Sequence, residues 1–184
     1  MVVLVDQEDN IIGLMEKLAA HKTGGHLHRA VSVLLYRTHN GQREALLQQR
    51  SKAKPLWPLF WSNTVCTHPR DGESYEDCAV RRLREEMGIA VIASQLGFLF
   101  KLLYRAKYNE LLAEYELDSV FIGTWDGVPT VNHEEAHNYT WMDWKDVKQD
   151  VINRPHLYTP WFQKLVHDPR VERALLGENI YERL

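Results

Sequence analysis

The sequence predicts a single domain of the α/β class, built around a mixed β-sheet. The length of 184 residues falls within the roughly 100–200 residues of one domain. A content of 45% hydrophobic and 26% charged residues is that of a globular chain with a substantial core. Segments with the two-residue period of strands are mixed with segments of helical period. No repeat or linker divides the chain, so we expect one domain over residues 1–184.

Four segments in the first part of the chain have strand patterns. They cover residues 2–5, 11–14, 26–37 and 44–49. The third is apolar on both faces, which is typical of a strand inside a sheet that is covered on both sides. We expect a short helical turn over residues 16–21, and a loop over residues 52–58, which contain two prolines.

The clearest predicted element is a helix over about residues 74–88. Ser74 can cap its first turn, with Asp77 three residues later, and Gly88 can end it. The apolar positions at helical spacing are Ala79, Val80, Leu83 and Met87. Arginine and glutamate form i,i+4 pairs on the other side.

The rest of the chain alternates between the two patterns. Further strands are expected at residues 97–104, 114–124 and 139–142. Further helices are expected at residues 143–150, 160–167 and 169–176. This mixture of strands and helices is what predicts the α/β class.

Charge and composition exclude several classes of protein. A formal net charge of −3 excludes a strongly basic nucleic-acid-binding surface, and no apolar run approaches the roughly 18 residues of a membrane span. The first residues lack the pattern of a signal peptide. Cys66 and Cys78 are too few for a disulfide framework and fit a reducing compartment. We therefore predict a cytoplasmic protein with neither nucleic acid nor membrane as partner.

Nine histidines are unusual for this length, and three of them suggest a metal site. Glu114 and Glu116 are two residues apart, so they share one face of a predicted strand. Together with His21, His28 and His68 they can enclose one divalent ion, and mixed nitrogen and oxygen ligands suit Mn²⁺, Mg²⁺ or Zn²⁺. By spacing alone, a structural, hydrogen-bonded role is more frequent for a histidine than a role as a metal ligand.

Residues 73–89 resemble the Nudix box, G-x5-E-x7-R-E-U-x-E-E-x-G-U, in which U is apolar. Aligned on Gly88, the matching positions are Glu73, Arg81, Leu83, Glu85, Glu86 and Ile89. Two positions depart: Thr67 replaces the first glycine, and Arg82 replaces a glutamate that helps Nudix hydrolases to bind metal. The resemblance implies a Nudix-like α/β/α sandwich with a weakened hydrolytic metal cluster. The alternative is an exposed helix carrying ion pairs.

A more specific resemblance covers about residues 11–165. The chain is similar to the type 1 isopentenyl-diphosphate isomerases, chiefly through the Cys-x-His-Pro segment at residues 66–69 and the Glu-x-Glu pair. Thr67 departs from the glycine that is frequent there. The other positions that carry the resemblance are Glu16, Lys17, His21, His28, Arg50, Lys54, Trp57, Trp61, Asn63, Tyr104, Arg105, Pro160 and Trp161.

That resemblance implies transfer of a double bond from isopentenyl to dimethylallyl diphosphate through a tertiary carbocation. Cys66 and Glu116 are expected to flank the carbon chain as proton-transferring groups, with Tyr104 hydrogen-bonded near Glu116. Trp161 is expected to place its π face beside the cation, because indole is the strongest aromatic partner for positive charge. The pocket must exclude water, which would trap the cation.

The same resemblance implies how the diphosphate is held. Lys17, Arg50, Lys54 and Arg82 are expected to bind it, together with a Mg²⁺ ion carried by Glu86 and the substrate. The other metal ligands implied are His21, His28, His68, Glu114 and Glu116. A monomer acting on a small diphosphate is expected. The alternatives are a Nudix hydrolase of a nucleoside or isoprenoid diphosphate, which Arg82 disfavours, and a non-catalytic module with a structural metal.

Overall fold

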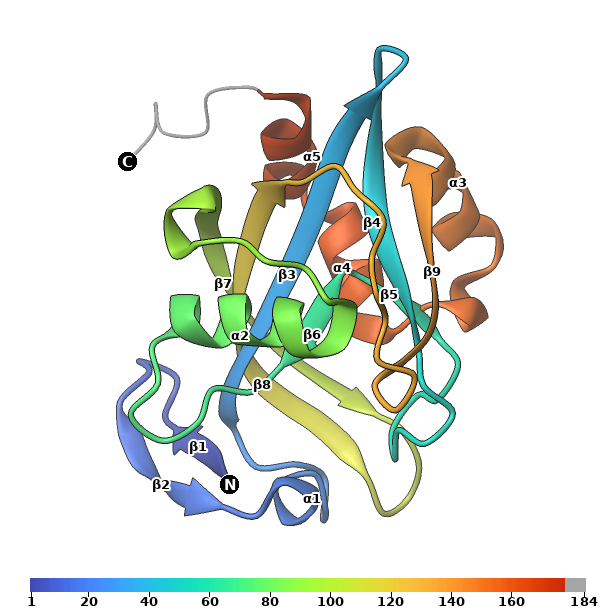
Figure 1. The fold of residues 1–184 in the computed structure, drawn as a ribbon. Coiled ribbons are helices and arrows are strands. Elements are labelled where there is room, and N and C mark those ends of the chain that lie inside the picture. The colour runs from blue at the N-terminus through green and yellow to red at the C-terminus, as the bar shows by residue number, and fades with distance from the viewer. Residues whose placement is uncertain (178–184) are drawn as a thin grey trace.

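A mixed β-sheet with helices on both faces runs through the protein (Figure 1). The computed structural model describes residues 1–177. The strands are β1 (Val2–Val5), β2 (Ile11–Met15), β3 (His28–His39), β4 (Gln42–Arg50), β5 (Trp61–Ser62), β6 (Val65–Thr67), β7 (Leu96–Lys107), β8 (Ala113–Thr124) and β9 (Ala136–Asp143). The helices are α1 (Lys17–Ala20), α2 (Tyr75–Met87), α3 (Trp144–Asn153), α4 (Pro160–His167) and α5 (Pro169–Leu176).

Strand β3 is the centre of the sheet. It pairs antiparallel with β1, β4 and β6, and parallel with β8. The parallel register begins with His28 beside Glu116 and ends with Tyr36 beside Thr124. Strand β8 also pairs with β7, and β4 pairs with β9. The parallel pairing therefore brings two polar residues from distant parts of the chain side by side.

Alternate residues of β3 face two separate cores, as its apolar pattern predicts. Val31, Val33 and Leu35 pack in the core that also contains buried residues of α2. Leu34 packs in the other core, with residues of α3, α4 and α5. The predicted α/β/α sandwich with a mixed sheet is confirmed.

The predicted central helix is confirmed together with both of its caps. The Ser74 hydroxyl accepts a hydrogen bond from the Asp77 backbone N–H at 3.0 Å, and Gly88 adopts the left-handed conformation with φ of 66°. Cys78 and Ala79 are fully buried on the inner side, whereas Val80 is only half-buried.

Several boundaries differ from the prediction. Strand β9 begins at Ala136, three residues before the predicted start. The short strands β5 and β6 were not predicted, because two or three residues are too few to show a period. Two 3₁₀ turns, Ala93–Gln95 and Pro155–Leu157, were also not predicted.

The domain prediction extends beyond the part of the chain that the structure describes. Residues 178–184, the last of the predicted domain 1–184, lie outside it. Within residues 1–177, none of the helices has the length and apolar character that crossing a membrane requires.

Candidate active site

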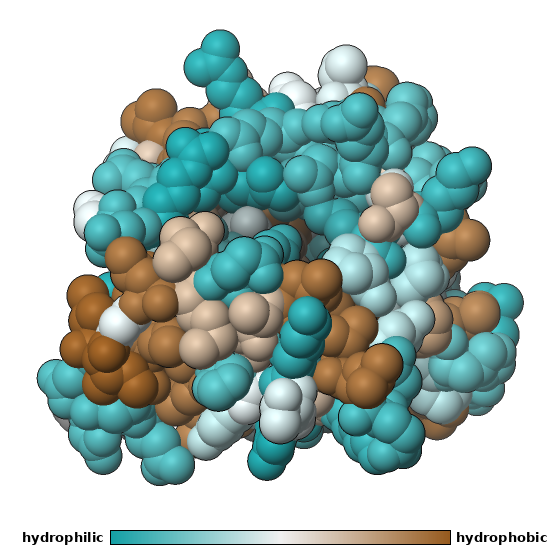
Figure 2. Space-filling view, turned by 90° about the horizontal axis from the view of Figure 1, so that it is seen from below, coloured by the Kyte–Doolittle hydropathy of each residue, from teal (hydrophilic) through white to brown (hydrophobic). Residues whose placement is uncertain are grey.

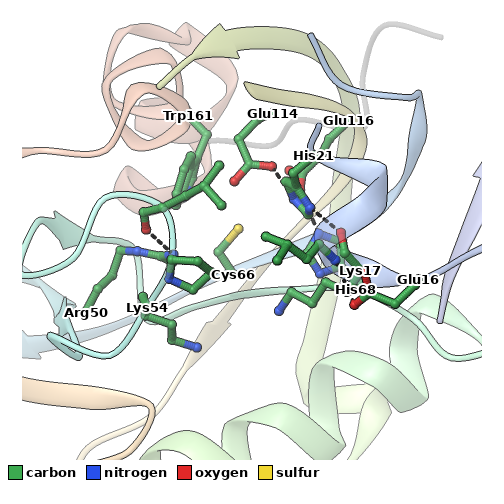
Figure 3. A pocket seen from close by; sticks show the side chains of 13 residues that line it. Glu16, Lys17, His21, Arg50, Lys54, Cys66, His68, Glu114, Glu116 and Trp161 are labelled. Atoms are coloured by element: carbon green, nitrogen blue, oxygen red, sulfur yellow. Dashed lines mark hydrogen bonds and ion pairs between the residues drawn. The ribbon is translucent and has the colours of Figure 1, made fainter. Parts of the chain in front are cut away.

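A cavity of about 230 Å³ lies where α1, the end of β4, β6, β8 and α4 meet. Seen from below, the surface is hollowed near its middle, between a hydrophilic side and a more apolar side (Figure 2). Figure 3 shows the lining side chains: Cys66 lies between the His and Glu side chains and the basic pair Arg50 and Lys54. Trp161, Leu56 and Pro55 add apolar wall.

The five predicted metal ligands come together at one end of this cavity. His21 follows α1, His28 begins β3, His68 follows β6, and Glu114 and Glu116 lie on β8. Each offers one ligand atom, and these atoms all lie within 4.8 Å of one another. The parallel pairing of β3 and β8 explains part of this arrangement, since His28 and Glu116 are direct neighbours in the register.

The histidine rings are oriented for metal binding. His21 Nδ1 lies 2.6 Å from the Lys17 carbonyl oxygen, and His28 Nδ1 lies 2.7 Å from that of His26. Because a carbonyl oxygen only accepts, each Nδ1 donates a hydrogen bond, which leaves each Nε2 as the ring nitrogen available to a metal ion.

Two buried atoms in the cluster lack hydrogen-bond partners, His28 Nε2 and Glu114 Oε2. The Glu114 oxygen lies 2.7 Å from His21 Nε2 without hydrogen-bond geometry. Unpartnered buried atoms in a group of five possible ligand atoms, all within 4.8 Å of one another, are what a cation site provides. The residues present therefore fit a divalent metal ion.

The two glutamates of the cluster differ in their electrostatics. Burial opposes ionisation of Glu116, but interactions with the imidazoles of His28 and His68, whose Nε2 atoms lie 3.4 and 2.8 Å from Glu116 Oε1, outweigh it and hold the pKa of this carboxyl well below its usual range. Burial and the neighbouring Glu116 charge raise the pKa of Glu114. Burial lowers the pKa of His68 to about 3, so its imidazole is neutral, the form that binds metal.

Cys66 and Tyr104 stand on either side of Glu116. The Tyr104 hydroxyl donates a hydrogen bond to Glu116 Oε2, as expected from the sequence, although Tyr104 itself does not line the cavity. Burial, and then the charge of Glu116, raise the pKa of the Cys66 thiol well above its usual value. The thiol therefore holds its proton at neutral pH.

Trp161 reaches the cavity from α4 and is 1% exposed. Its indole Nε1 donates to Ser62 Oγ at 2.9 Å, which fixes the ring. The Arg50 guanidinium carbon lies 5.1 Å from the ring centroid. The ring is thus already held in a position where it attracts positive charge.

The predicted diphosphate-binding residues divide into two groups. Lys17, Arg50 and Lys54 line the cavity, whereas Arg82 and Glu86 do not. Burial, followed by the charges of Lys54 and Arg82, lowers the pKa of Lys17. Three cations around one cavity favour an anionic ligand.

Arg50 also supports the loop that follows it. Its Nε donates to the Trp57 carbonyl at 3.0 Å and its guanidinium to the Leu56 carbonyl at 2.9 Å. Trp57 has a φ of 45°, a strained value for a tryptophan. Arg50 therefore stabilises the loop whose Leu56 forms part of the cavity wall.

Arg82 and Glu86 belong to an ion-pair network on α2. The guanidinium donates to Glu86 Oε1 at 2.6 Å and to Glu85 Oε2 at 2.9 Å. It also lies 3.1 Å from Glu135 Oε1. The other oxygen of Glu86 accepts from Gln48 at 3.0 Å.

Two polar residues near the site were not found from the sequence. Asp118 is fully buried, accepts a hydrogen bond from Ser32 Oγ at 2.7 Å, and has a pKa raised to about 8 by burial and by Glu116. Its position two residues after Glu116 on the same strand face was a usable signal. Glu135, which pairs with Lys54 and Arg82, lies in a loop that carries no such signal.

The remaining matches to the Nudix box are ion pairs or core positions. Glu73 accepts two hydrogen bonds from Arg81, at 2.6 and 2.8 Å, and Arg81 also reaches Glu85 at 3.0 Å. Cys78 is fully buried among apolar residues of the core.

Comparison with known proteins supports the Nudix-like fold and the resemblance to the Nudix box. The sequence profile of the NUDIX domain matches residues 26–162. A crystal structure from Deinococcus radiodurans superposes with a TM-score of 0.70 at 19% identity, covering 90% of this chain and 96% of that one. The NUDIX domain of Shewanella oneidensis NrtR superposes with a TM-score of 0.61 at 15% identity, covering 81% of this chain and 87% of that one. The chain is a member of the Nudix superfamily.

Curated sequences narrow the family further. Isopentenyl-diphosphate Delta-isomerase 1 of Photorhabdus laumondii is 42% identical over 163 residues, 89% of this chain and 90% of that protein. Isopentenyl-diphosphate Delta-isomerase of Serratia proteamaculans is 37% identical over 183 residues, 100% of this chain and 94% of that protein. The chain belongs to the isopentenyl-diphosphate Delta-isomerase family.

Proposed function

We propose that this protein isomerises isopentenyl diphosphate to dimethylallyl diphosphate, as a step of isoprenoid biosynthesis. The observation that carries the proposal is the placement of Cys66 and Glu116 in one cavity that also contains a His/Glu cluster and three cations. A hydrolase has no use for a thiol that lines the same cavity as an indole ring. Membership of the isomerase family supports the same activity.

Protonation of the alkene at its terminal carbon gives a tertiary cation, which then loses a proton from the neighbouring methylene carbon. Cys66 and Glu116 are the two groups that transfer these protons, and Tyr104 is bonded to Glu116 where it can pass a proton to that carboxyl. The face of Trp161 stabilises the cation. The buried wall excludes the water that would trap it.

We infer which residues would hold the metal ions and the diphosphate from the positions of the candidate ligands. His21, His28, His68, Glu114 and Glu116 would hold one divalent ion, Mn²⁺, Mg²⁺ or Zn²⁺, which would fix Glu116 and tune its acidity. Lys17, Arg50 and Lys54 would bind the diphosphate from the cavity wall. Arg82, which lies outside that wall, would add its positive charge, and Glu86 together with the substrate would carry a Mg²⁺ ion. Two free cysteines fit the reducing cytoplasm, and we expect the enzyme to act there as a monomer.

The test is proton NMR of the purified protein with isopentenyl diphosphate and Mg²⁺ in D₂O. We expect dimethylallyl signals, with deuterium entering the methyl and allylic positions. Cys66→Ala should abolish this turnover, while Cys78→Ala, in the other cysteine, should retain it. Release of phosphate instead would favour the hydrolase. Tight metal binding without turnover would favour a non-catalytic module.

A further inference from the structure

Glu135 connects two of the cations expected to bind the diphosphate. Its Oε1 lies 3.1 Å from the Arg82 guanidinium, and its Oε2 accepts a hydrogen bond from Lys54 Nζ. Lys54 lines the cavity, whereas Glu135 does not. The carboxylate of Glu135 therefore binds Lys54 from outside the wall of the cavity that a substrate would fill.

The backbone holds Glu135 in this place. Its N–H donates to the Asn132 carbonyl at 2.9 Å, and its own carbonyl accepts from the Ser51 N–H at 3.0 Å. The Asn132 N–H in turn donates to the Glu86 carbonyl at 2.9 Å. These backbone hydrogen bonds attach the loop both to α2 and to the segment after β4. They fix the backbone position from which the Glu135 carboxylate reaches its partners.

Arg82, one of the two cations that bind Glu135, is already surrounded by negative charge. Arg82 faces three carboxylates, those of Glu85, Glu86 and Glu135. Burial opposes ionisation of Glu135, but Lys54 and Arg82 lower its pKa to about 2, so it is an anion at every physiological pH. A diphosphate that needs the same cations must approach this fixed negative charge.

We propose that Glu135 is an internal counter-anion that competes with the substrate's diphosphate for Lys54 and Arg82, and so limits how tightly that group is held. The inference rests on the proposed function, since it takes a diphosphate as the ligand of these cations. An enzyme whose substrate and product carry the same diphosphate gains turnover when that group is released readily.

The sign of the effect distinguishes this role from a structural one. Glu135→Gln keeps the size and hydrogen-bonding ability of the side chain and removes its charge. Loss of a repulsive charge strengthens anion binding, whereas loss of a scaffold weakens it. We expect the Kd for a diphosphate to fall about tenfold, equivalent to about 1.4 kcal/mol.

Isothermal titration calorimetry of the full chain with inorganic pyrophosphate measures this directly. The control is Glu134→Gln, because Glu134 is exposed and forms no ion pair within residues 1–177. A lower Kd in Glu135→Gln alone supports the proposal. An unchanged or higher Kd overturns it, and so does an equal decrease in the control.

A second variant covers the case in which Glu135→Gln folds poorly. Glu135→Asp keeps the charge and withdraws it from Lys54 by one methylene, so the Kd should fall by a smaller factor. In a Lys54→Met background, Glu135→Gln should have a reduced effect if the competition acts through Lys54, and an undiminished effect would contradict it. Pyrophosphate binding needs no turnover, so absence of isomerisation would refute the proposed function without deciding the role of Glu135.

Discussion

Two clusters of acidic side chains lie near the cavity, and they differ in the groups that contact their carboxylates. Glu85 and Glu86 of α2, and Glu73 just before this helix, are each bonded to arginine. On β8, Glu114 and Glu116 meet imidazoles instead, and Glu114 Oε2 has no hydrogen bond. The carboxylates at the helix are paired with permanent cations, whereas those of the strand face imidazole nitrogens that can bind a metal ion.

This difference separates the family motif from the chemistry. The Nudix-like helix has the spacing of a metal-binding box, but Arg82 occupies the space among its carboxylates. The strand cluster has no such motif in any one segment, yet it satisfies the geometric needs of a metal ion. In this protein the Nudix-box segment identifies the fold, whereas the residues proposed to transfer protons lie on the strands of the sheet.

The largest expected effect compares one glutamate from each cluster. Glu116→Gln should reduce isomerisation by about 10³-fold, because the carboxylate both transfers a proton and binds the ion. Glu85→Gln should change the rate by less than threefold or so, since a half-exposed ion pair contributes little. Initial rates by NMR and metal content by mass spectrometry measure both. Equal losses in the two variants would show that the clusters share one role.

Removal of the metal ion should lower the stability of the protein through the β8 cluster and leave the contribution of the cluster at α2 unchanged. Addition of Mn²⁺ or Zn²⁺ to chelator-treated protein should raise its stability by about 2.7 kcal/mol at a hundredfold excess over the Kd. Glu114→Gln removes a ligand charge, so most of that gain should disappear, and Glu73→Gln is the matched control on the helix side. Thermal unfolding with and without the metal gives the readout. A gain retained in Glu114→Gln would place the ion elsewhere.

Restoring the glutamate of the Nudix box tests the helix cluster. Arg82→Glu brings a fourth carboxylate beside Glu85, Glu86 and Glu135, so we expect a loss of about 2 kcal/mol in the free energy of unfolding. Urea denaturation measures it, with the exposed Arg84→Glu as the control for reversed charge. Phosphate release by a stable Arg82→Glu protein would mean that one residue separates the two activities.

The smallest effect is a pH-dependent stability at Glu135. Its pKa is lowered from 4.5 to about 2 in the folded protein, so its ion pairs stabilise the fold above pH 4.5 and lose their effect as the pH falls toward 2. Glu135→Gln should therefore cost about 1 kcal/mol at pH 7, reduced from the full linkage value because the side chain is partly exposed. Urea titrations at several pH values give the difference between variant and wild type. A difference that persists at pH 2 would have another origin.

Local signals in the sequence predicted the elements that carry strong periodicity. The α2 helix was predicted from Ser74, Gly88 and an apolar stripe, all of which act within a few residues of one another. Strand β3 was predicted because both of its faces are apolar, and both proved to be covered. The metal ligands followed from residue type together with the family resemblance.

What escaped prediction depends on contacts between distant segments. Strand β6 exists only because Val65 to Thr67 pair with β3, which sets Cys66 opposite Ser32. Glu135 reaches Lys54 only after its loop is bonded both to α2 and to the segment that follows β4. Arg82 was expected at the diphosphate, and only the three-dimensional arrangement shows how many carboxylates surround it.

The parallel alignment of β3 with β8 makes the active centre a late product of folding. His28 and Glu116 come from opposite halves of the chain, and parallel strands with such separation close slowly because a long intervening segment must be ordered first. A slip of one residue between these strands would turn their side chains to the wrong face. A newly made chain can therefore capture its ion only once this long-range pairing of β3 with β8 is correct, and metal uptake becomes a measure of correct folding at this point of the sheet.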